Sequence, residues 1–103
     1  MNINTKTKKL IELIKGYLIG NVSCEQLQGF AWKVIDFFSS KDPSELPPPE
    51  SYEREFWFSI WQIVHLADEE HEREGLTKKE LTKALNYLTK KSKMPKDCIG
   101  RRP

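Results

Sequence analysis

Apolar residues recur every three or four positions along most of the chain, which is the period of α-helices with one buried face. No segment alternates apolar and polar residues as a strand would. The pattern therefore predicts an all-α fold, a four-helix bundle-like single domain. Helices are expected at about residues 7–19, 24–39, 52–74 and 78–91.

Two of these helices have full start signals. Ser23 and Gln26 form a capping box before the second helix, in which each side chain bonds a backbone N–H of the other residue. Thr77 and Glu80 have the same spacing before the fourth helix. The turn between the third and fourth helices is short, so these two helices are expected to be antiparallel neighbours.

The third helix, residues 52–74, is the element around which the others are expected to pack. Ser51 is a suitable N-cap, and Gly75 is suited to the left-handed conformation that ends a helix. Its first two-thirds is rich in aromatic residues and its last turns are acidic. One end is therefore expected to anchor the core and the other to project carboxylates into solvent.

Two segments have no helical pattern. Residues 41–50, KDPSELPPPE, form a Pro-rich linker, because consecutive prolines cannot continue a helix and favour an extended chain. Residues 92–103, SKMPKDCIGRRP, are expected to form a flexible basic tail, with Met94 or Ile99 attached to the surface. The helical domain then covers residues 1–91.

The composition is typical of a single soluble domain. The chain has 103 residues, of which 31% are charged, and its mean hydropathy is −0.63. The apolar stretch from Phe56 to Ala67 is too short and too often interrupted to cross a bilayer, and the N-terminal residues are not expected to form a signal peptide. A cytoplasmic location is expected. Cys24 and Cys98 are read as reduced thiols, with a disulfide between them as the alternative.

The net charge of +2 is unevenly distributed along the chain. Residues 1–41 carry +3, residues 42–74 carry −8, and residues 75–103 carry +7. A strongly acidic middle segment steers basic partners and repels nucleic acid. The alternative is that the lysines of the fourth helix neutralise the acids within the fold.

The sequence offers little for catalysis or metal binding. Asp68 and His71 are one helical turn apart, but di-metal carboxylate proteins need two such motifs and further carboxylates. Ser23 is explained by its capping role, Cys24 has no histidine near it in sequence, and no glycine-rich phosphate loop is present. We expect no catalytic residue, no metal, no cofactor and no small-molecule substrate.

Acidic residues at the end of the third helix are the strongest candidate for a site. Like charges four residues apart, and acids at a helix C-terminus, both disfavour a helix, so their presence there suggests a functional surface. Such a surface suits a basic protein partner. The candidate partner-binding residues are Asp68, Glu69, Glu70, Glu72, Glu74, Glu53 and Trp57.

Aromatic side chains are candidates for the centre of an interface. Trp57 or Trp61 would serve as a hot spot if exposed, and the alternative places both in the core. Trp32 lies to the side of the apolar face of the second helix, which is either broadly buried or offers an aromatic residue to a partner.

Nucleic-acid binding is the alternative function. The basic tail can contact phosphates. Against this, the acidic segment opposes a phosphate backbone, and the fourth helix lacks the Arg, Asn and Gln residues typical of base recognition. The C-terminal lysines and arginines concerned are Lys90, Lys91, Lys93, Lys96, Arg101 and Arg102.

A family resemblance covers roughly residues 10–90. The segment YLIGNVSCEQLQGFAWKVIDFF, the proline linker, FWFSIWQIVHLADEE and the final Leu-rich helix together resemble the small all-helical immunity proteins of colicin D-type and contact-dependent growth inhibition toxins. The resemblance implies a cytoplasmic antidote whose carboxylates cover the basic cleft of a toxin nuclease domain. The positive net charge departs from the acidic character of many such antidotes.

Overall fold

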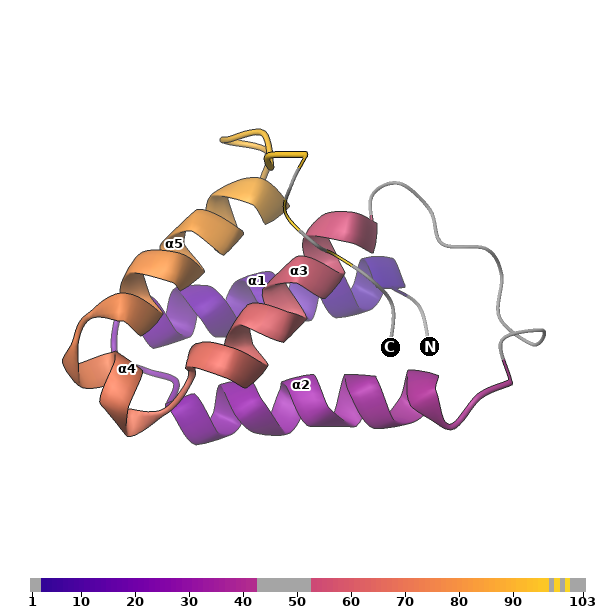
Figure 1. Cartoon of the computed structure of the whole chain (residues 1–103), viewed down its shortest axis with the longest axis horizontal. Coiled ribbons are helices and arrows are strands. Elements are labelled where there is room, and N and C mark those ends of the chain that lie inside the picture. Colours follow the sequence, from indigo (N-terminus) through magenta and orange to yellow (C-terminus); the bar gives the residue numbers. More distant parts are fainter. Residues whose placement is uncertain (1–2, 43–52, 97, 99, 101–103) are drawn as a thin grey trace.

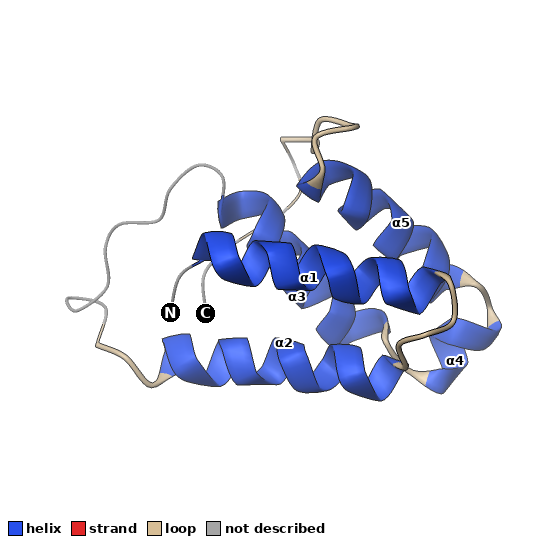
Figure 2. Ribbon diagram, turned by 180° about the vertical axis from the view of Figure 1, so that it is seen from behind, coloured by secondary structure: helices blue, strands red, loops and turns tan. Residues whose placement is uncertain are grey.

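The computed structural model describes residues 3–42, 53–96, 98 and 100. These residues contain helices and no strand, which confirms the all-α expectation for this part of the chain (Figures 1 and 2). Residues 43–50 of the predicted proline linker and the Ser51 cap lie outside the described residues. The five helices are α1 (Ile3–Leu18), α2 (Cys24–Ser39), α3 (Glu53–Leu66), α4 (Glu69–Arg73) and α5 (Leu76–Leu88).

One apolar core joins the four longer helices. Each of them contributes side chains spaced three or four residues apart, as an amphipathic helix requires. Phe38 of α2 and Phe56 of α3 both meet the ring of Trp57 edge-on, with ring centroids 5.0 and 4.9 Å apart. The larger aliphatic side chains that are fully buried in this core are Leu10, Ile14, Leu27, Val34, Ile60, Ile63 and Leu81.

α3 and α5 lie side by side and run in opposite directions, although their connection contains α4 and is not the short turn that was expected (Figure 1). α1 lies behind α3 in this view, and α2 runs along the lower edge. None of the helices in the described ranges has both the length and the apolar content needed to cross a membrane.

α2 has the predicted bounds and the predicted cap. The backbone N–H of Gln26 donates to Ser23 Oγ at 3.2 Å, and the N–H of Ser23 donates to Gln26 Oε1 at 2.8 Å. α1 begins at Ile3, earlier than expected, because the Ile3 side chain is buried in the core and holds the first turn.

The prediction of one continuous helix over residues 52–74 is wrong. α3 ends at Leu66, and Asp68 takes an extended conformation (φ −136°, ψ 169°) as the N-cap of α4. Its carboxylate accepts a hydrogen bond from the backbone N–H of His71 at 2.8 Å. This local bond competes with helix continuation, which is why Asp favours helix starts over helix interiors.

The start of α5 also differs from the prediction. Gly75 (φ 76°) is its N-cap and makes no side-chain cap bond, so the expected Thr77–Glu80 capping box does not form. Thr77 is instead buried in the first turn of α5, where its hydroxyl donates to the carbonyl of Leu66 at 2.5 Å. α5 ends at Leu88, earlier than residue 91.

The described part of the C-terminal segment contacts α3. Met94 is buried, with 3% of its surface exposed. The Arg54 guanidinium donates to the backbone carbonyls of Pro95 at 2.5 Å and Cys98 at 2.9 Å. The flexibility expected for residues 92–103 stays a prediction, but these hydrogen bonds attach Pro95 and Cys98 to Arg54 in the first turn of α3.

Candidate functional site

The seven candidate residues fall into three groups with different surroundings. Glu69, Glu70 and Glu74 are exposed and make no side-chain hydrogen bond or ion pair within the described part of the chain. Asp68 and Glu72 are exposed but bond within the protein. Glu53 and Trp57 are buried. The structure therefore brings five acids together around α4 and separates them from the other two residues.

Asp68 organises the start of α4. Beyond its cap bond, its Oδ2 lies 2.8 Å from Nδ1 of His71. The backbone N–H of His71 and then its ring lower the pKa of the Asp68 carboxyl, and this carboxylate raises the pKa of His71. Each group therefore favours the charged form of the other, and the pair holds the first turn of α4 in place.

Glu72 connects α4 to two other helices. Its Oε2 accepts hydrogen bonds from the Tyr17 hydroxyl and the Cys24 thiol, each at 2.9 Å. These bonds, the one from Cys24 first, lower the pKa of Glu72. Burial and then Glu72 raise the pKa of Tyr17, and the same two causes raise that of Cys24 to about 11. Sequence reasoning found the carboxylate but not its partners.

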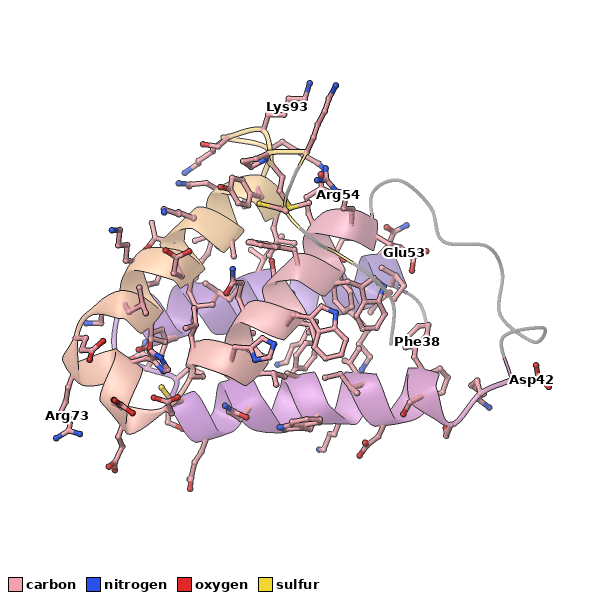
Figure 3. All side chains as sticks on the ribbon, viewed as in Figure 1. Phe38, Asp42, Glu53, Arg54, Arg73 and Lys93 are labelled. Carbon is pink, nitrogen blue, oxygen red and sulfur yellow. The ribbon has the colours of Figure 1, made fainter. Side chains whose placement is uncertain are left out.

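Glu53 and Trp57 are not surface residues. Trp57 is 1% exposed and Glu53 is 4% exposed, and the indole N–H donates to Glu53 Oε1 at 3.3 Å. Figure 3 shows Glu53 at the start of α3, on the side facing Phe38 of α2. Trp57 therefore does not act as the exposed hot spot that the sequence suggested. Trp61 is partly buried against the core.

Trp32 on α2 is the more exposed tryptophan. Its side chain is 46% exposed, and its Nε1 donates to Gln28 Oε1 at 3.1 Å. The amide of Gln28 in turn donates to the carbonyls of Ile63 at 3.3 Å and Ala67 at 3.0 Å. Trp32 is thus not broadly buried, and its role as an aromatic residue offered to a partner stays a prediction.

The electrostatic setting of the acids differs from the one expected. Because α4 is a separate helix, Glu69 and Glu70 lie in its first turn, where the helix dipole favours negative charge. The helix dipole therefore does not oppose these two acids, and the expectation that they lie at a helix C-terminus is wrong. Glu74, the C-cap of α4, does lie at a helix C-terminus. What remains is their lack of partners in the described residues.

The lysines of α5 do not pair with these acids. Lys83 pairs with Glu80 of its own helix at 3.3 Å. Lys78 contributes to lowering the pKa of Glu72. No ion pair in the described residues joins α5 to Glu69, Glu70 or Glu74, so direct neutralisation by the last helix is not the arrangement found.

The opposite end of α5 is basic and has a pocket of about 340 Å³. Lys90 pairs with Glu55 Oε1 at 3.4 Å, and Glu55 Oε2 is buried without a hydrogen-bond partner among the described atoms. Lys93 lies at this end, far from Arg73 of α4 (Figure 3). The pocket is lined by Arg54, Glu55, Lys90, Ser92, Lys93 and Met94.

The described side chains do not form a candidate metal site. Within the described ranges, no group of three or more His, Cys, Asp and Glu side chains is arranged to hold a metal ion. Cys24 and Cys98 are not joined as a disulfide, so the reduced alternative describes this structure.

Comparison with protein-family models, with curated proteins and with solved structures finds no match to this chain. The fold and site therefore define the class only as an all-helical protein with an acidic surface at α4. Function has to be argued from the residues of that surface.

Proposed function

We propose that this chain is a cytoplasmic immunity protein. It would neutralise a toxin by binding to the toxin's nuclease domain and covering the basic cleft of that domain. The observation that carries the proposal is the group of three carboxylates on α4, Glu69, Glu70 and Glu74. They are exposed and lack partners in the described residues. No reaction is assigned to the protein.

Two physical effects support a cationic protein as the partner. Unpaired surface carboxylates create a negative potential that accelerates encounter with a basic surface. The three carboxylates make no hydrogen bond or ion pair in the described part of the chain. They can therefore form ion pairs with a partner without breaking any existing bond among the described residues. Asp68 and Glu72 instead serve to hold α4, and the contact surface is reduced to the three glutamates.

The test is binding to the C-terminal domain of the protein encoded directly upstream. Glu69→Gln with Glu70→Gln is compared with Glu12→Gln with Asp36→Asn, a control pair on α1 and α2 that removes the same charge. We expect the α4 pair to lower the association rate on the order of tenfold at low salt and the control pair to leave it within about twofold. Equal effects of the two pairs, or no binding, would contradict the proposal.

A nucleic-acid-associated role remains the second candidate, favoured by the basic pocket at the end of α5. Two observations weaken it, since Arg54 is bonded to carbonyls and Lys90 to Glu55. Truncation after residue 91 would remove buried Met94 and is therefore not a clean test. Lys93→Gln with Lys96→Gln changes exposed side chains only, and should abolish nucleic-acid binding while sparing toxin binding.

A further inference from the structure

Among the described residues, Glu72 is the one side chain of α4 that hydrogen-bonds to other helices. None of the five residues of α4 is buried, so apolar packing contributes little to holding it. Glu72 supplies side-chain hydrogen bonds to α1 and α2, through the Tyr17 hydroxyl and the Cys24 thiol. A single carboxylate oxygen therefore joins three helices at this end of the molecule.

The ends of the segment that contains α4 are fixed independently of Glu72. Thr77 Oγ1 donates to the carbonyl of Leu66 at 2.5 Å, which brings the start of α5 to the end of α3. Gln28 holds the carbonyl of Ala67 at 3.0 Å. Residues 68–75 thus form a loop with a closed base, and such loops open locally without unfolding the elements that flank them.

We propose that Glu72 is a latch: its hydrogen bonds to Tyr17 and Cys24 keep α4 docked, and their loss lets residues 68–75 move away as a unit and uncovers the Cys24 thiol. The latch is a conformational device that exists whether or not the protein binds a toxin. Its consequence for partner binding, that Glu72 orients the carboxylates of α4, rests on the proposed function.

The thiol of Cys24 reports the state of the latch. In the docked state, burial and Glu72 raise its pKa to about 11, so very little of the reactive thiolate is present at neutral pH. Release removes the contribution of Glu72, and with it whatever part of the burial α4 provides. The rate at which Cys24 reacts with a thiol reagent therefore rises with the fraction of molecules in which α4 is undocked.

The experiment measures this rate with an aromatic disulfide reagent in the full chain carrying Cys98→Ser, so that Cys24 is the reacting thiol. The Cys24 thiolate attacks one sulfur, a mixed disulfide forms, and the aromatic thiolate leaves. Glu72→Ala should raise the rate about tenfold or more, the effect of one pKa unit on the thiolate fraction. Glu70→Ala removes the same charge from the same helix and should stay within about twofold of the parent.

Two outcomes overturn the latch: a Glu72→Ala rate within about twofold of the parent, or an equal rise in Glu70→Ala. If circular dichroism shows that Glu72→Ala is unfolded, Tyr17→Phe is used as the test variant instead, because it removes one of the two hydrogen-bond donors to Glu72. We expect Tyr17→Phe to raise the rate about threefold, and no rise there overturns the proposal. Since no partner is present, failure here is distinct from failure to bind a toxin domain.

Discussion

Trp57 donates its indole N–H to a carboxylate oxygen of Glu53, one helical turn earlier, and both side chains are buried. The bond satisfies the one polar group of Trp57 inside the core, as buried indoles require. It also gives a buried acid a hydrogen-bond donor, without which the burial of a charged group is costly. The first turn of α3 is thereby fixed against the aromatic core.

Trp57→Ala should destabilise the protein far more than Trp32→Ala. Removing a buried tryptophan typically costs about 3–5 kcal/mol, because a cavity is left behind. Trp32 is half exposed, and its removal should cost less than about 1 kcal/mol. Urea unfolding followed by circular dichroism measures both. Similar losses for the two variants would contradict the placement of Trp57 in the core.

Alanine should have opposite effects at Gly75 and Gly29. Gly75 has a φ of 76°, a left-handed conformation that costs an alanine about 1–2 kcal/mol. Gly29 lies inside α2 with open space at its Cβ position, so alanine should stabilise the helix by about 0.5–1 kcal/mol. Thermal unfolding of the two variants tests this difference in sign, and a stabilising Gly75→Ala would disprove it.

Thr77→Val tests the hydrogen bond that joins the start of α5 to the end of α3. Valine keeps the shape of threonine but removes the hydroxyl that bonds Leu66, and we expect a loss of about 1 kcal/mol in the free energy of unfolding. Thr82→Val is the matched control, since Thr82 is exposed and bonds only the carbonyl of Lys78 in its own helix. If the free energy of unfolding falls by the same amount in both variants, the hydrogen bond between Thr77 and Leu66 does not contribute specifically to stability.

The Asp68–His71 pair predicts a pH window for α4. The pKa of Asp68 is lowered, so its contribution is present above the ordinary carboxyl pKa and is lost on acidification through the folded value. The pKa of His71 is raised, so its contribution is present below about 6.5 and is lost as the pH rises through its folded value. The pair is therefore most effective between these two limits.

An NMR titration of the two imidazole signals measures the effect directly. In the wild type, the His71 inflection should lie above the ordinary histidine value. Asp68→Asn removes the carboxylate and should return the inflection toward that value. An unchanged His71 inflection in Asp68→Asn would show that the pair does not form in solution.

Local signals in the sequence determined α2 fully but misplaced the end of α3. The Ser23–Gln26 capping box acts within one turn, so a pattern of four residues suffices to locate it. At Asp68 two local preferences compete, continuation of a helix and capping of a new one. An Asp followed by two Glu residues is a helix-start signal, but the apolar period running up to Ala67 favoured the longer helix.

The surroundings of the candidate residues could not be read from local patterns. Glu72 lies in the same charged run of the sequence as Glu70 and Glu74, yet it alone of the three bonds Tyr17 and Cys24, which the packing of α1 and α2 brings to it. Glu53 looks like an ordinary first-turn acid in the sequence, but its side chain is buried. The acidic character of the α4 segment was therefore predictable from the sequence. Which of its carboxylates bond within the described part of the chain, and which do not, was not.

Gly16 sets the position of the turn that presents Tyr17 and Cys24. A Cβ atom at this position would lie 2.5 Å from a methyl carbon of Val22, so a side chain here would require Val22 to shift. Tyr17 and Cys24 lie on either side of this turn and donate to the same oxygen atom of Glu72. The absence of a side chain at Gly16 therefore permits the close α1–α2 turn that separates the two donors to a helix much later in the chain.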